Sequence, residues 1–190
     1  MKRRDQSDDN LDDDEQTENG GVNAVELLRE DHRKVQDLFE EFEGADNRSR
    51  QRIADQALTE LEIHAKLEEQ IIYPAIREVL DEEDLIDEAL EEHHAAELLM
   101  KELRKMGPKD ERYRAKFKVM AEMVKHHIEE EESQVLPQAE QSDLDLTELG
   151  QEAMMLKEKL MAKMSTGPSR SKKKSPKPTG RGRNRKRTAA

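Results

Sequence analysis

The chain has 190 residues, of which 41% are charged and only 3% are aromatic, and its formal net charge is −12. It contains no cysteine, which excludes disulfides, thiolate metal sites and cysteine nucleophiles and makes a reducing cytoplasm the expected location. No segment approaches the roughly 18 consecutive apolar residues of a membrane span, so an integral membrane protein is excluded. The first residues include two adjacent arginines with no apolar stretch behind them, so no secretion signal is expected.

Charge divides the chain into three parts. Residues 1–20 hold eight acids and three bases, whereas residues 165–190 hold ten bases and no acid. Neither segment has enough apolar surface to offset the chain entropy lost on folding, so we predict disorder over an acidic segment, 1–21, and a basic segment, 165–190. One folded domain is expected over 22–164. The basic segment is suited to bind nucleic acid or an acidic protein, but a simple solvated tail explains it equally well.

The middle of the chain is rich in strong helix formers such as Glu, Leu, Lys, Ala and Met, and strand-like alternation is not seen. Asn23, followed by Glu26 three residues later, resembles a capping box and begins the first predicted helix, which ends near Gly44. Glycine or proline is predicted to end or bend most of the later helices, which we expect over residues 48–73, 84–106, 110–136 and 146–164. Short connections between the first four predict an all-α fold, an antiparallel up-down-up-down four-helix bundle with a short fifth C-terminal helix.

Two of the predicted helices share a histidine pattern. The segments HAKLEEQIIYP, from His64, and HIEEEESQVLP, from His127, both read H-x3-E-E-x4-P. Because four residues turn through about 400° and rise about 6 Å in a helix, each histidine lies on the same face as the first glutamate, Glu68 or Glu131. That separation is the reach that two ligands of one metal site need.

The other two long helices each add one histidine to an apolar face. Apolar residues follow His32 at offsets of 3, 6, 7 and 10, and the same offsets are apolar from His93 but not from His94. On the fourth helix His127 is preferred to His126, because only His127 keeps the glutamate and proline spacing. The four preferred histidines are therefore expected to face one interior, and the chain resembles two similar helical hairpins.

Buried histidines without partners would be costly to desolvate, and a bound metal removes that cost. Imidazole together with carboxylate suits Fe, Mn, Zn or Co. Four histidines and two glutamates exceed the ligand number of a tetrahedral zinc site and are enough for two metals bridged by carboxylates. A set of His–Glu hydrogen bonds inside the bundle is the alternative. The remaining glutamates of the fourth helix, Glu132 among them, are predicted to form a solvated face.

The segments LLREDHRKVQDLF, LEIHAKLEEQIIYP, ALEEHHAAELL and VKHHIEEEESQVLP resemble the four helices of the hemerythrin-like, HHE cation-binding domain. The resemblance covers about residues 23–164 and is closest to bacterial members with an extra C-terminal helix; here a basic tail follows it. It implies an antiparallel bundle around a non-haem centre of two irons per chain, with Mn or Zn as alternative metals. Carried over position by position, it implies terminal ligands and bridging carboxylates at His32, His64, His93, His127, Glu68 and Glu131.

One position departs from the oxygen-carrying hemerythrins that the chain resembles. Those proteins have a second histidine on the third helix, where this chain has Ala89. Glu97 is geometrically the best substitute as an additional ligand, and Glu92 and His94 are alternatives. The loss argues against simple reversible carriage of O2 and favours reaction with peroxide or nitric oxide, or exchange of metal.

Two classes of function follow. The first is a non-haem di-iron protein that binds, senses or reacts with O2, peroxide or NO; no residue identifies a substrate, so turnover is left open. The second is a structural or zinc-binding bundle whose basic tail binds nucleic acid or another polyanion. The highly charged helix surfaces predict a monomer.

Overall fold

The computed structural model describes residues 21–80 and 84–165, and every regular element in these residues is helical. The two predicted disordered segments lie outside the described residues, apart from their inner ends. The long helices are α1 (Ala24–Gly44), α2 (Asn47–Leu67), α4 (Asp84–Leu103), α5 (Tyr113–Glu130) and α7 (Leu146–Ser165). Two π-helical turns and two short helices extend α2 and α5: η1 (Glu68–Ile72), α3 (Tyr73–Arg77), η2 (Glu131–Val135) and α6 (Leu136–Gln141).

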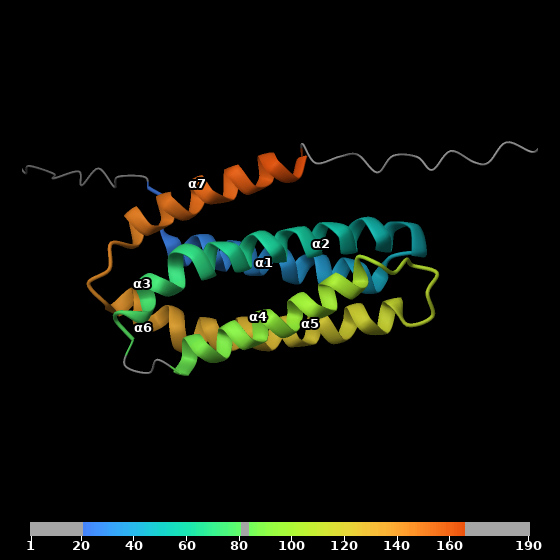
Figure 1. Cartoon of the computed structure of the whole chain (residues 1–190), viewed down its shortest axis with the longest axis horizontal. Helices are drawn as coiled ribbons and strands as arrows, with labels where there is room; N and C mark the ends of the chain where they lie inside the picture. Colours follow the sequence, from blue (N-terminus) through green and yellow to red (C-terminus); the bar gives the residue numbers. More distant parts are fainter. Residues whose placement is uncertain (1–20, 81–83, 166–190) are drawn as a thin grey trace, which may run out of the picture.

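The helices form two antiparallel hairpins that pack side by side. α1 pairs with α2, α4 pairs with α5, and α7 lies across the first hairpin, where it contacts α1, α2 and η1 (Figure 1). The all-α bundle with a fifth helix is therefore confirmed. The fifth helix is not short, however, because its 20 residues equal the length of α4. Among the described residues, no helix combines the length and the apolar character needed to cross a membrane.

Side-chain caps fix the starts of the first hairpin's helices. The backbone N–H groups of Val25 and Glu26 donate to the Asn23 side-chain oxygen, as the predicted cap requires. Asp46 caps α2 in the same way, accepting from the N–H groups of Arg48 and Ser49. The third helix is a little shorter than predicted, because α4 ends at Leu103, and the fourth begins later than predicted, at Tyr113.

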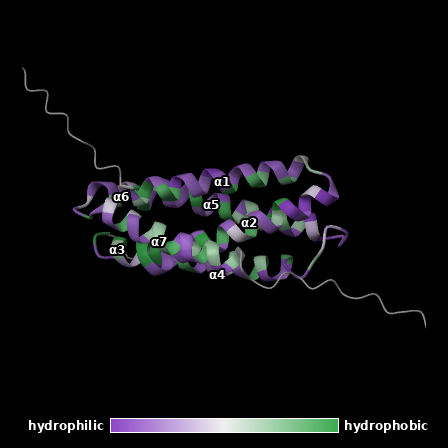
Figure 2. Ribbon diagram, turned by 90° about the horizontal axis from the view of Figure 1, so that it is seen from above, coloured by the Kyte–Doolittle hydropathy of each residue, from purple (hydrophilic) through white to green (hydrophobic). Residues whose placement is uncertain are grey.

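Apolar side chains fill the bundle in two clusters. One cluster, around Phe39, Phe42 and Phe117, includes a stacked pair of rings with centroids 3.8 Å apart. The other, around Leu28, Ile72 and Ile86, extends under α7. The outward helix faces are largely hydrophilic (Figure 2). Between the two clusters lies a layer of polar side chains, which is where the predicted ligands meet.

The prolines of the repeated histidine pattern do not end their helices. α2 continues through η1 and past Pro74 to Arg77, and α5 continues through η2 and past Pro137 to Gln141. In each π-helical turn an N–H bonds back five residues, from Tyr73 to Glu68 in η1. The wider turn gives the proline ring room that a regular α-helical turn would deny it. The prediction that these prolines end the helix is therefore wrong.

Candidate metal centre

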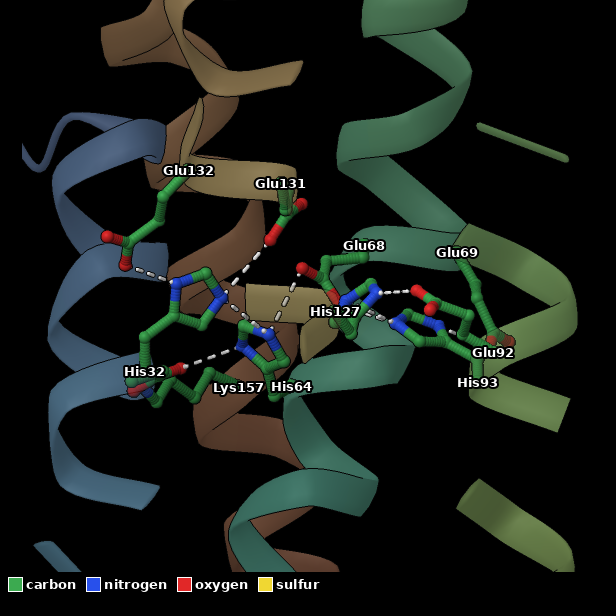
Figure 3. Close-up of polar contacts among 11 residues, drawn as sticks. His32, His64, Glu68, Glu69, Glu92, His93, His127, Glu131, Glu132 and Lys157 are labelled. Carbon is green, nitrogen blue, oxygen red and sulfur yellow. Dashed lines mark hydrogen bonds and ion pairs between the residues drawn. The ribbon is translucent and has the colours of Figure 1, made fainter. Parts of the chain in front are cut away.

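One histidine from each of the four bundle helices points into the polar layer (Figure 3). His32 comes from α1, His64 from α2, His93 from α4 and His127 from α5. Three of them are buried, and His93 is nearly so. The structure thus brings together all four histidines that the spacing singles out. The neighbouring His94 is exposed and stays outside the layer.

The inward nitrogens of these rings face one another in pairs. The Nε2 atoms of His32 and His64 are 3.1 Å apart, and those of His93 and His127 are 3.2 Å apart. Where the outer Nδ1 carries the proton, a neutral ring presents a lone pair at Nε2. Two lone pairs at this distance repel each other unless a proton or a cation lies between them.

Two buried glutamates complete the inner layer. Glu68 Oε1 lies 3.1 Å from His64 Nε2, and its Oε2 lies 3.3 Å from His93 Nε2, so one carboxylate contacts both hairpins. Glu131 Oε2 lies 3.1 Å from His32 Nε2. Within the described part of the chain, none of the four carboxylate oxygens has a partner with hydrogen-bond geometry. Buried carboxylate oxygens that face only histidine nitrogens are costly unless a proton or a cation lies between them, which is the first sign that the layer can hold cations.

Outer carboxylates hold the histidine rings from behind. His32 Nδ1 lies 2.8 Å from Glu132, His93 Nδ1 lies 3.2 Å from Glu69, and His127 Nδ1 lies 2.8 Å from Glu92. For His64 the corresponding acid is Asp31, at the longer distance of 3.9 Å. A carboxylate behind a ligating imidazole orients the ring and raises its basicity. The prediction of a solvated face is correct for the exposed Glu129 but incomplete for Glu132, whose side chain is 39% exposed and also contacts His32. The doubled glutamate of the shared pattern was the signal for this second role.

The contacts repeat between the two hairpins. In each hairpin the acid before the first histidine faces the second histidine, which gives the pairs Asp31–His64 and Glu92–His127. In each hairpin the second glutamate of the doublet reaches the first histidine of the other hairpin, which gives Glu69–His93 and Glu132–His32. The weak sequence repeat thus corresponds to a repeated geometry.

The layer also shifts proton affinities. Burial lowers the pKa of His64, but the surrounding carboxylates, Glu68 foremost, together raise that pKa to about 10. Burial likewise opposes protonation of His93, yet its contacts with the carboxylates of Glu68 and Glu69 raise its pKa to about 9. Burial raises the pKa of Glu68, but His64 and His93 together hold it well below its usual range. Without metal, protons on His64 and His93 partly balance the carboxylates.

Tyr73 adds a buried hydroxyl to the same layer. Its ring stacks on His93 with centroids 5.7 Å apart, and its hydroxyl has no hydrogen-bond partner among the described residues. Burial, together with the charges of Glu68 and Glu131, raises the pKa of Tyr73 well above 10, so the phenol stays neutral. It is available as a hydrogen-bond donor to a group bound in the layer.

Two small cavities adjoin the histidines. A mainly apolar cavity of about 40 Å³ is lined by the four histidines together with side chains such as Val35 and Met100. A second, of about 20 Å³, is lined by Ala89, Glu131 and His127. Each exceeds the roughly 10–15 Å³ that a water molecule needs. The second cavity lies where the expected third-helix histidine is missing.

Glu97 is not brought into the inner layer. It is exposed and pairs with Lys101 at 2.7 Å. Glu92 lies closer to the centre, where it contacts His127 and lines the smaller cavity. The remaining histidine, His126, is exposed and lies 3.5 Å from Glu130.

The donor set fits two cations. In the first group, ligand atoms of His32, His64, Glu68 and Glu131 lie within 4.8 Å of one another; in the second, those of Glu68, His93 and His127 do. Glu68 belongs to both groups. The set contains nitrogen and oxygen but no sulfur, which suits Fe, Mn, Zn or Co. Cations in these two positions would be coordinated by the facing histidine nitrogens and by the inner carboxylate oxygens.

Two known proteins are similar to this chain. A curated DNA nickase from Nostoc sp. is 27% identical over 113 residues, which make up 59% of this chain and 32% of the relative. The chain therefore spans about a third of that protein's length. The crystal structure of a hemerythrin HHE cation binding domain-containing protein from Mycobacterium kansasii superposes with a TM-score of 0.66 at 26% identity. That likeness covers 77% of this chain and 94% of the other.

The family match covers the residues that build the centre. The model of the hemerythrin HHE cation binding domain matches residues 23–139, which include all four histidines and both inner glutamates. These residues make up more than half of the chain and contain both hairpins. The chain belongs to the hemerythrin HHE cation-binding domain family.

Proposed function

We propose that the bundle holds two metal ions, iron in the cell, in the two ligand groups that share Glu68. The observation that supports this most directly is the Glu68 carboxylate, which points one oxygen at each histidine pair and has no hydrogen-bond partner among the described residues. Glu131 serves as the second bridging carboxylate in the proposal. His32, His64, His93 and His127 act as terminal ligands. Manganese or zinc are the alternative metals.

The proposed ligand is a small oxidant or diatomic molecule, namely O2, peroxide or NO. The cavities of about 40 and 20 Å³ beside the histidines have room for molecules of this size. Bound iron would supply the redox chemistry for such ligands. The chain itself supplies orientation through the outer carboxylates, exclusion of bulk water through burial, and a neutral hydrogen-bond donor at Tyr73.

Metal content and an absorption spectrum test the proposal, on full-length untagged protein purified without added metal. We expect about two irons per chain and a near-ultraviolet absorption band that changes when O2, peroxide or NO is added. His64→Ala and Glu131→Ala should abolish loading, whereas His94→Ala, at an exposed neighbour of a ligand, should not. Unchanged loading in the first two variants, or a single zinc per chain, would contradict the proposal.

A second candidate function concerns the basic segment. Residues 165–190 hold ten bases and no acid, and the curated relative is a DNA nickase. We propose that this segment binds nucleic acid by neutralising phosphates. The bundle would then either keep its redox function or serve only as a structural or zinc-binding domain. Deleting residues 168–190 should abolish DNA binding that weakens steeply with salt and leave metal content unchanged. Equal binding by the truncated chain would contradict this proposal.

A further inference from the structure

Among the four histidines of the layer, His64 is supported differently from the rest. The other three Nδ1 atoms lie 2.8, 3.2 and 2.8 Å from a carboxylate oxygen. His64 Nδ1 is 3.9 Å from the nearest oxygen of Asp31, and it has no hydrogen-bond partner among the described residues. Of the four inner histidines, only His64, in the more deeply buried pair with His32, has no hydrogen bond from Nδ1 to a carboxylate.

The fifth helix explains the difference. Asp31 is paired through its other oxygen with Lys157 of α7, and both side chains are buried. The pair joins residues 126 positions apart in the sequence. In the second hairpin the corresponding acid, Glu92, pairs with His127 itself. α7 packs on the first hairpin, so only this half of the layer receives a lysine from it.

The position of the ammonium group matters because the pair is buried. A charge in a water-poor interior acts more strongly on its neighbours than the same charge on the surface. A carboxylate that accepts a hydrogen bond from Nδ1 makes an imidazole a better metal ligand, and losing such support typically costs 10–100-fold in metal affinity. A lysine that pairs with the carboxylate keeps it from accepting this hydrogen bond, so the imidazole is a weaker metal ligand.

We propose that Lys157 is a positioning residue that makes the two metal positions unequal. By engaging Asp31, it leaves His64 as the weakest imidazole ligand, so the position held by His32 and His64 binds metal less tightly than the position held by His93 and His127. This inference rests on the proposed metal centre. It assigns a role to α7 that the four bundle helices do not supply.

The test is a stepwise titration of metal-free full-length protein with Co²⁺, followed by visible absorption. We expect two affinities in the wild type. Lys157→Met should tighten the weaker position about 10-fold and leave the other unchanged, because Asp31 is then free to accept from His64. Lys157→Arg keeps a cation on Asp31 and should behave as the wild type. Unchanged, weaker or uniformly altered affinities in Lys157→Met would overturn the proposal.

A double variant keeps the test decisive if Lys157→Met does not fold. Asp31→Asn combined with Lys157→Met removes both charges, and wild-type affinities are expected because His64 has no carboxylate hydrogen bond in either protein. A loss of 10-fold or more at one position would show that Asp31 supports His64 despite the lysine, and would sink the idea.

A spectroscopic readout separates positioning from a merely structural role. In Zn²⁺-loaded protein, the ¹⁵N chemical shift of His64 Nδ1 should move toward the values of the other three rings in Lys157→Met and stay in place in Lys157→Arg. A shift that stays in place in Lys157→Met would count against the proposal. Failure of the wild type to bind two metals would instead refute the proposed function, so the two failures are distinguishable.

Discussion

At the scale of single residues, the centre depends on paired carboxylates with different tasks. The first glutamate of each doublet, Glu68 or Glu131, faces the inner layer, and the second, Glu69 or Glu132, supports a histidine from behind. Adjacent residues on a helix point about 100° apart, so one glutamate of a doublet can face the inner layer while the other lies behind a histidine ring. In the proposed centre, the first member would bind metal and the second would hold the histidine ring.

Replacing an outer carboxylate tests this division of tasks. Glu132→Ala should lower metal affinity by about 10–100-fold, because His32 loses the partner that orients its ring. Glu129→Ala, at an exposed position on the same helical segment, is the matched control and should leave affinity unchanged. Isothermal titration with Co²⁺ measures both. Equal affinities in the two variants would mean that the Glu132 contact has no role in binding.

At the scale of elements, α7 is attached to the first hairpin by a close backbone contact. A Cβ placed on Gly150 would lie 1.9 Å from the backbone oxygen of Val22 and 2.8 Å from the backbone nitrogen of Ala24. Only glycine permits this approach without movement of the backbone. The contact fixes how closely α7 approaches the start of α1. Lys157 lies two turns farther along α7, where it pairs with Asp31.

The variant Gly150→Ala should therefore push α7 away from the bundle. We expect a loss of about 1–3 kcal/mol in the free energy of unfolding, as overpacking typically causes, measured by urea denaturation. Gly44→Ala, where an added Cβ meets nothing within 4 Å, is the control and should not destabilise the protein. If the two variants are equally stable, the close contact does not hold α7.

The sequence is sufficient to predict the helices, the bundle and the four inner histidines, because these follow from periodicity and spacing along one chain segment. It fails where a wider turn or a distant partner decides the outcome. The prolines are predicted to end or bend α2 and α5, whereas π-helical turns let the chain continue. The contacts of Glu132 and Lys157 join segments 100 and 126 residues apart, and no local pattern specifies them.

At the scale of the whole molecule, neither hairpin completes a metal position alone. His32 receives its outer carboxylate from the second hairpin, and His93 receives its own from the first. Glu68 contacts a histidine in each hairpin. The ligand groups therefore form only when the two hairpins have packed together, which couples metal binding to folding.

The metal-free protein should lose stability as the pH rises from about 6.5 to about 10. The pKa of His64 is about 10 and that of His93 about 9 in the folded state, against 6.5 as the ordinary value. The folded state then holds more protons than the unfolded state across this interval. The unfolding free energy should fall with a slope approaching about 1.4 kcal/mol per pH unit for each histidine.

Two variants identify the source of that slope. His64→Gln removes one titrating ring with little change in volume and should flatten the dependence, whereas the exposed His94→Ala should leave it intact. Glu68 has the opposite sign: its lowered pKa stabilises the fold above its ordinary value of 4.5, and that contribution is lost as the pH falls toward its folded pKa. Urea denaturation of metal-free protein at several pH values measures these effects. Identical slopes in all three proteins would contradict the assignment.

The polar layer also has an electrical balance. Six carboxylates lie within 4 Å of the four histidines, and one ammonium, that of Lys157, joins them through Asp31, which leaves five negative charges when the imidazoles are neutral. Two divalent ions would leave the layer with one net negative charge, and two trivalent ions with one net positive charge. If the proposed pair of ions is bound, the layer would be closest to neutrality between these states, and a metal that changes valence would match that balance better than zinc, whose charge is fixed. Without the lysine, neutrality would require both ions to be trivalent, so a single side chain of α7 shifts the balance toward the reduced metal.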